Sequence, residues 1–249
     1  MLAIVSFFWV DPSRAKMRRV GLTPEDVKAW DRMIARHLTL PHKRICVTHR
    51  PDLVDFMATY PLDMAKHVPG TCTVKLQAHD PAFAKAIGAD RIVLMDIDAV
   101  AVGNLDPLFD HADDVRLWMN PNFEQGGKRG FYQGSMQYFR AGATEQLWSD
   151  FDPRETPSWL NRRFGGAEQC WISERLNTSY PDPGWDWDIP YWTETDGVYG
   201  AGRLFGGKMG NGVQSDLPEN ARIVFFPGDR SPSEATTQAA HPWIVQHYN

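Results

Sequence analysis

The sequence has few cysteines and lacks the motifs of several common enzyme classes. It contains three cysteines in 249 residues and no Cys-x-x-Cys pair, which argues against both a disulfide framework and a cysteine-based zinc site. Its eight histidines form no HxxH or HExxH pattern. G-x-S-x-G, Walker A and G-x-G-x-x-G motifs are also absent. Zinc-protease, serine-hydrolase and phosphate-loop chemistry are therefore not indicated.

Long apolar runs are absent as well. The apolar start, residues 1–10, is too short to span a bilayer and has no basic leader or small-residue cleavage site, so we interpret it as a first strand. Reduced thiols and the missing leader favour a cytoplasmic protein with no membrane span. The net charge of −5 disfavours nucleic acid as a partner, although short basic patches such as residues 14–19 leave it possible.

Strand-like and helix-like segments alternate through the chain, which predicts an α/β fold with a mostly parallel central sheet. Thr23-Pro24 starts a helix, and Gly88 ends another that begins at Asp80-Pro81. We expect strands at residues 2–8, 44–48, 91–95, 115–119, 135–139 and 221–226. We expect helices at residues 24–38, 55–59, 81–86, 144–151, 159–164 and 167–176, irregular structure at 178–220, and a short tail element at 242–248. No domain boundary is visible.

The most informative feature is a pair of aspartates after an apolar run. Asp96 and Asp98, with Ile97 between them, come where the expected strand 91–95 ends, and ligands bind at such strand ends in open α/β sheets. Six Asp and no Lys or Arg lie between Arg91 and Arg116. This pattern favours Mg²⁺ or Mn²⁺ held by carboxylate oxygens, which can then carry a diphosphate. The alternative is that the aspartates accept hydrogen bonds from the loop backbone.

The run DRIVLMDIDAVAVGNLDPLF, residues 90–109, resembles the D-x-D region of glycosyltransferases of the GT-A fold, and it is closest to family 8 and related bacterial and phage-type sugar transferases. Gly134-Ser135 is similar to that family's turn and strand beside the sugar pocket. Glu168-Gln169 is similar to its turn and helix start. The resemblance implies one GT-A-like domain over residues 1–249, with a nucleotide-binding half (1–110) and an acceptor half (111–249) containing the irregular loop 178–220.

The resemblance also implies roles for individual residues. Asp96, Ile97 and Asp98 would hold the metal and donor, while Ser6, Phe7 and Trp9 at the end of the first strand would meet the nucleoside. Gly134 and Ser135 would line the sugar pocket. Glu168 would bond sugar hydroxyls, and Gln169 would approach the reacting carbon. The remaining donor contacts would come from the C-terminal loop, at Gly228 and Arg230.

The C-terminal loop departs from the family pattern. Where the family has a histidine ligand and a diphosphate-binding lysine, this chain has Phe225 and Ser231, or Pro227 in a shifted alignment. Arg230 could replace the lysine. We expect His241 as the third metal ligand, with His247 or water as alternatives.

These features together predict a metal-dependent glycosyltransferase. It would use Mn²⁺ or Mg²⁺ to move a sugar from a nucleotide-diphosphate donor, with UDP-sugar favoured, to a glycan, a protein or a nucleic-acid base. One alternative is a haloacid-dehalogenase-type phosphohydrolase with Asp96 as nucleophile, although that motif normally lies near the N-terminus. The other alternative is a nucleotide-sugar-binding module with weakened catalysis, which the missing histidine and lysine would explain.

Overall fold

The computed structural model describes residues 1–10, 21–119, 124–125, 128–129, 132–154, 167–176, 189–204, 216–226 and 231–248. Within these ranges the chain forms a central sheet in the order β10-β6-β9-β4-β1-β2-β3 and a smaller sheet in the order β11-β12-β5. The central strands are β1 (Leu2–Phe8), β2 (His42–Thr48), β3 (Ala58–Pro61), β4 (Arg91–Met95), β6 (Val115–Met119), β9 (Tyr132–Arg140) and β10 (Tyr191–Trp192). The smaller sheet contains β5 (Ala99–Ala101), β11 (Val198–Gly200) and β12 (Ile223–Phe225), and a separate ribbon pairs β7 (Glu124–Gln125) with β8 (Lys128–Arg129).

The central sheet is mostly parallel, as the sequence predicts. Strand β1 pairs in parallel with β2 and β4, β2 with β3, and β10 with β6. Only β9 runs antiparallel to its two neighbours, β4 and β6. Side chains of β1 and β4 enter hydrophobic clusters on both faces of the sheet, which accounts for their continuous apolar runs.

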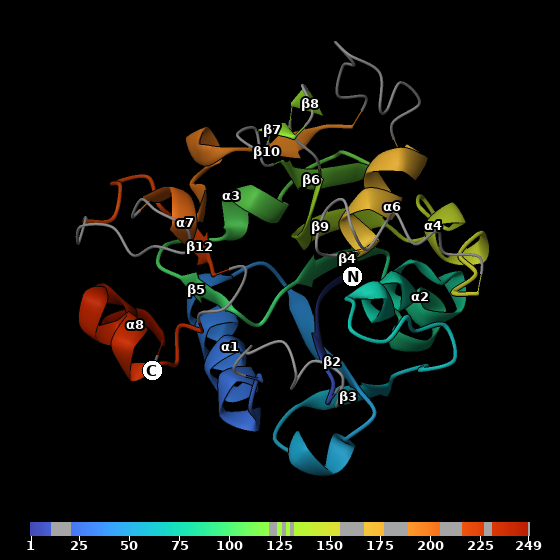
Figure 1. Ribbon diagram of the computed structural model, residues 1–249, viewed down its shortest axis with the longest axis horizontal. Helices are drawn as coiled ribbons and strands as arrows, with labels where there is room; N and C mark the ends of the chain where they lie inside the picture. Colours follow the sequence, from blue (N-terminus) through green and yellow to red (C-terminus); the bar gives the residue numbers. More distant parts are fainter. Residues whose placement is uncertain are drawn as a thin grey trace.

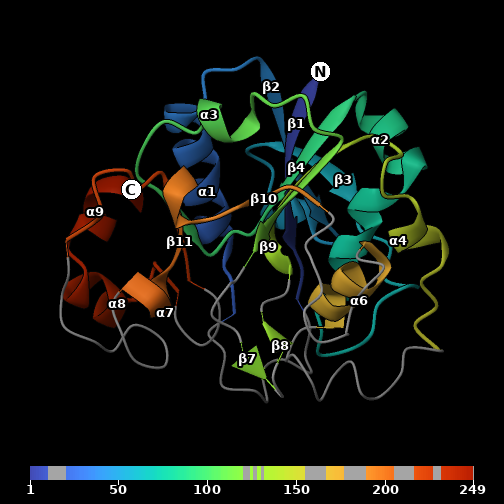
Figure 2. The ribbon, with the colours of Figure 1, turned by 90° about the horizontal axis from the view of Figure 1, so that it is seen from above.

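Helices cover both faces of the sheet. Figures 1 and 2 show α1 (Pro24–His37) on one side, with α2 (Pro81–Ile87), α4 (Gln146–Ser149) and α6 (Ala167–Leu176) on the other. The remaining described helices are α3 (Asp106–Phe109), α7 (Ala201–Leu204), α8 (Ala235–Ala240) and α9 (Trp243–Tyr248), and 3₁₀ turns form η2 (Pro51–Leu53), η3 (Thr73–His79) and η4 (Glu194–Asp196). Among the described residues, no helix is long and apolar enough to cross a membrane.

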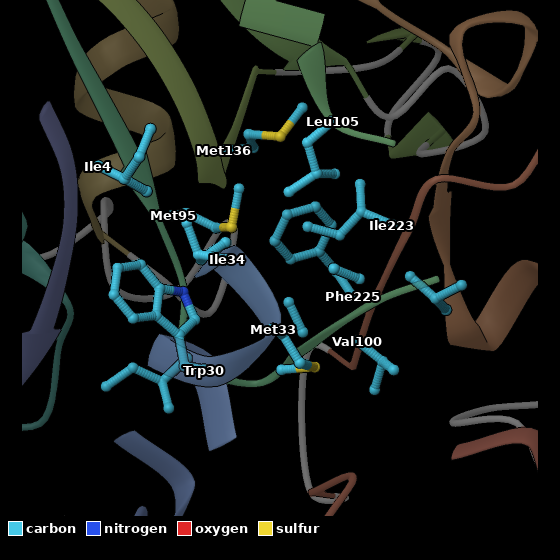
Figure 3. Packing of buried hydrophobic residues seen from close by; sticks show 14 of the residues in the cluster. Ile4, Trp30, Met33, Ile34, Met95, Val100, Leu105, Met136, Ile223 and Phe225 are labelled. Carbon is cyan, nitrogen blue, oxygen red and sulfur yellow. The ribbon is translucent and has the colours of Figure 1, made fainter. Parts of the chain in front are cut away.

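Helix α1 begins as the sequence predicts. Thr23 and Asp26 form a reciprocal capping box, and Pro24 occupies the first turn. Its apolar stripe is fully buried: Figure 3 shows Trp30, Met33 and Ile34 packed among residues of both sheets, including Met95 and Phe225. This packing fixes the small sheet beside the end of β4.

Three local predictions were wrong or incomplete. The helix expected at residues 55–59 is instead a turn leading into the edge strand β3, where Thr59 and Tyr60 suit extended backbone. The stretch expected to be irregular at 178–220 contains β10, η4, β11 and α7. The helix expected at 144–151 is shortened to α4, and the one at 159–164 lies outside the described residues.

Candidate active site

Asp96 and Asp98 follow the carboxyl end of β4, between the two sheets. The backbone N–H of Asp96 donates to the carbonyl of Ser135 on β9 at 2.9 Å, and the carbonyl of Asp98 accepts from the N–H of Phe226 at 2.8 Å. Ile97 is buried in the core, while both aspartates are partly exposed. The core therefore receives Ile97, while Asp96 and Asp98 keep part of their surface outside it.

A buried lysine lies against the first aspartate. The Nζ of Lys75, on η3, is 3.0 and 3.2 Å from the two carboxylate oxygens of Asp96, and it also donates to the carbonyl of Gly134 at 3.2 Å. It is 3.0 Å from Oε1 of Glu168. Burial alone would lower the pKa of Lys75, but the charges of Asp96 and Glu168 outweigh burial and raise it. Lys75 is therefore a permanent cation shared by two carboxylates.

Glu168 is the most enclosed acid of this group, with 1% of its surface exposed. Its carboxylate lies directly over Gly134: a Cβ at that position would come within 2.6 Å of Oε1. The second oxygen, Oε2, is buried and has no hydrogen-bond partner among the described residues. Gly134 is therefore required by the close approach of Glu168, not by its own backbone conformation.

The neighbouring residue Gln169 contacts the same strand. Its Nε2 donates to Oε1 of Gln133 at 3.0 Å, and Gln133 is 5% exposed. Glu168 and Gln169 thus lie against two consecutive residues of β9. The structure brings together four of the predicted site residues, Asp96, Gly134, Glu168 and Gln169, around Lys75 and Gln133.

Other predicted donor residues are more deeply placed. Ser6 is fully buried within β1 and Phe7 is 4% exposed, whereas Trp9, just after the strand, is partly exposed. Ser135 is 4% exposed, and its backbone carbonyl anchors Asp96. Gly228 and Arg230, together with Pro227, lie outside the described residues.

The donor set fits a hard divalent cation in its chemistry. Asp96, Asp98 and Glu168 carry three formal negative charges against one positive charge on Lys75, which leaves −2, and all the carboxylate donors are oxygens. Within the described part of the chain, however, no group of three or more His, Cys, Asp or Glu residues is arranged to hold a metal. His241, the predicted third ligand, is 2% exposed at the end of α8, and its ring centroid lies 6.3 Å from that of Trp243.

Phe225, at the position of the family's histidine, belongs to the core. Its ring stacks on Trp118 at a centroid distance of 4.8 Å, and the side chain is fully buried.

Sequence reasoning missed Lys75 and Gln133. Lys75 lies where the sequence predicts neither a helix nor a strand, and the structure buries it within η3 (Thr73–His79), whose residues are all buried. The available signal was the position of Lys75 between the apolar residues Val74 and Leu76. A lysine buried among such residues is expected to have an acidic partner, because lysines are almost never fully buried unless they are paired.

Comparison of the sequence with protein-family models gave no match, and neither did comparison with curated proteins. Comparison of the structure with solved structures found glycosyltransferases. The galactosyltransferase LgtC, solved with donor and acceptor sugar analogs, superposes with a TM-score of 0.50 and 9% identity over 99% of this chain and 94% of LgtC. The glycosyltransferase GlyE of Streptococcus pneumoniae gives a TM-score of 0.53 and 11% identity over 94% of this chain.

This chain spans 57% of the length of GlyE but nearly all of LgtC. At such low identity the likeness concerns the fold. The mixed sheet with helices on both faces is the GT-A fold of these glycosyltransferases, as the sequence resemblance predicted.

Proposed function

We propose that this protein is a metal-dependent glycosyltransferase that takes a sugar from a nucleotide-diphosphate donor, with a UDP-sugar favoured. The observation that carries the proposal is the constellation at the end of β4. Asp96 and Glu168 come from distant parts of the sequence and meet at Lys75, while Gln169, the neighbour of Glu168, bonds to Gln133, and Asp98 lies two residues after Asp96. In open α/β sheets, ligands bind at this end of the strands.

The charge of the constellation supports a cation-assisted donor site. A formal charge of −2 repels a bare diphosphate, so a divalent cation is needed to bring the two together. Asp98 and Asp96 would hold Mn²⁺ or Mg²⁺, and His241 is kept as the proposed third ligand although the described residues do not group the three around a common point. When bound, the metal would neutralise charge on the diphosphate leaving group.

The chain's own residues would then orient the sugar. Lys75 fixes Asp96 and Glu168 in one arrangement, so neither carboxylate has to reorganise during reaction. The buried Oε2 of Glu168 is an acceptor for a sugar hydroxyl, and Gln169 lies beside it as the polar group for the reacting carbon. Trp9 is the partly exposed aromatic of the β1 end that would meet the nucleoside, with Ser6 and Phe7 supporting it. Gly228 and Arg230 remain proposed diphosphate contacts.

The likeness in fold to glycosyltransferases favours the transferase over the phosphohydrolase alternative. Phe225 is part of the core, at the position where the family has a metal-binding histidine. This observation supports the alternative of a nucleotide-sugar-binding module with weakened catalysis. The acceptor is proposed to be a glycan, a protein or a nucleic-acid base.

A thermal-shift and turnover screen tests the proposal. The protein is incubated with UDP, GDP, CDP and ADP with and without Mn²⁺, and then with UDP-glucose and UDP-galactose while free UDP is measured. We expect a metal-dependent rise in Tm with UDP and slow release of UDP from a UDP-sugar. Binding without release would support the binding module, and hydrolysis of an aryl phosphate with Mg²⁺ and no nucleotide response would support the phosphohydrolase.

A further inference from the structure

Two consecutive residues of β9 receive two consecutive residues from the start of α6. Gly134 leaves the space that the carboxylate of Glu168 fills, and Gln133 accepts the hydrogen bond from Gln169. Strand and helix are therefore matched residue by residue. Lys75 contacts both members of the Gly134–Glu168 pair, through the carbonyl of Gly134 and Oε1 of Glu168.

An irregularity in β9 places Gln133 for this contact. Leu117 of β6 pairs with Gln137, but the next residue, Trp118, pairs with Gln133 where regular antiparallel pairing would put Met136 opposite it. This register shift, a bulge or similar irregularity, lies next to the candidate site, and such features redirect side chains. Gln133 is only 5% exposed. Neighbouring residues therefore restrict the movement of its side chain.

From this geometry we infer that Gln133 is a positioning residue that orients the carboxamide of Gln169; the inference rests on the proposed function and deepens it. A carboxamide has a donor end and an acceptor end. Because the NH₂ end of Gln169 is bonded to Gln133, its carbonyl oxygen is turned away from Gln133 and is the end left for substrate. A fixed carbonyl dipole steadies positive charge that develops on the reacting carbon of the donor sugar, whereas a rotating amide presents either end.

Three variants test this role. Gln133→Leu keeps the approximate size and removes the acceptor, and Gln133→Glu keeps an acceptor oxygen for the Nε2 of Gln169. Gln169→Leu removes the oriented group itself. Gln146→Leu, a partly exposed glutamine on α4, is the matched control. A Tm within a few degrees of wild type qualifies each variant as folded.

The contact is measured without any ligand. In ¹⁵N-labelled protein, the side-chain amide signal of Gln169, assigned by its loss in Gln169→Leu, should shift in Gln133→Leu and stay near its wild-type position in Gln133→Glu and Gln146→Leu. An unchanged signal in Gln133→Leu would overturn the inference whatever the function.

The catalytic consequence is measured as UDP release from UDP-glucose and UDP-galactose with Mn²⁺. For Gln133→Leu we expect kcat to fall about 10- to 100-fold with KM within about threefold, because positioning acts on reaction more than on binding. Gln133→Glu should recover kcat to within about threefold, and adding Gln169→Leu to Gln133→Leu should cause little further loss. A wild-type kcat in Gln133→Leu, or equal losses of kcat in the Leu and Glu variants, would overturn the positioning role of Gln133 but not its contact with Gln169. Absent turnover in wild type would remove the proposed function, and the catalytic role with it, while the amide signal still reports the contact.

Discussion

Lys75 and Asp96 lie 21 positions apart in the sequence, yet the ammonium of one is within 3.0 and 3.2 Å of both carboxylate oxygens of the other. The pair changes how the aspartate motif is understood. Asp96 is part of a charge network that includes Glu168, and Asp98 follows two residues later, just before β5. Lys75 links the motif to the start of α6, where the sugar is proposed to lie.

Removing the lysine should destabilise the protein. In Lys75→Met, the carboxylates of Asp96 and Glu168 lose their shared partner, and breaking a buried ion pair costs about 3–5 kcal/mol. Urea denaturation measures the free energy of unfolding. Lys28→Met is the control, since Lys28 pairs with Glu25 and lies 5.2 Å from the centre of the Phe56 ring at a partly exposed position, and its loss should cost about 1 kcal/mol or less. Equal losses of unfolding free energy in Lys75→Met and Lys28→Met would show that the buried network stabilises the protein no more than the Lys28–Glu25 pair does.

Adding one methyl group at Gly134 should disturb the site. The Cβ of Gly134→Ala would sit 2.6 Å from Oε1 of Glu168, and that carboxylate is held by Lys75 and cannot simply swing away. We expect a loss of about 1–3 kcal/mol in stability from overpacking, with a weaker rise in Tm on adding UDP-sugar. Gly21→Ala, where a Cβ meets nothing within 4 Å, should be neutral. Full stability in Gly134→Ala would contradict the observed packing.

His79 should make stability depend on pH. It is buried beside Phe139, and burial lowers its pKa to about 3 from an ordinary value near 6.5. The unfolded chain therefore binds a proton that the folded chain refuses, so stability is complete above pH 6.5 and falls as the pH drops toward 3, by up to about 1.4 kcal/mol per pH unit. In His79→Gln, urea unfolding followed between pH 7 and 4.5 should show a shallower decline than wild type. Parallel pH profiles would mean that His79 is not buried in its neutral form.

Local signals were enough for the elements that deliver the aspartates. The apolar run of β4, the capping box of α1 and the glycine at the end of α2 each carry their information within a few residues, and each element formed as predicted. The strand β3 and the short strands β10 and β11 were missed because pairing with distant strands defines them, not their own two to four residues.

The site was predictable only in part for the same reason. Asp96 and Asp98 are recognisable by their position after a strand, and Glu168 and Gln169 by a family-like turn. Their connection through Lys75 and Gln133 depends on η3, β9 and α6 packing together, which no local pattern encodes. The absence of Lys and Arg between Arg91 and Arg116 suggested an aspartate site with no cation of its own. That inference was misleading, because Lys75, which lies earlier in the chain, pairs with Asp96.

In the proposed mechanism, Asp98 helps to hold a divalent cation for a nucleotide-diphosphate donor. Isothermal titration of UDP into the protein with Mn²⁺ tests it most directly, comparing wild type with Asp98→Asn and with Asp110→Asn, an exposed aspartate after α3. We expect wild type and Asp110→Asn to bind UDP, this binding to be lost with EDTA, and Asp98→Asn to bind at least about tenfold more weakly. Equal UDP affinity in all three proteins, unchanged by EDTA, would contradict it.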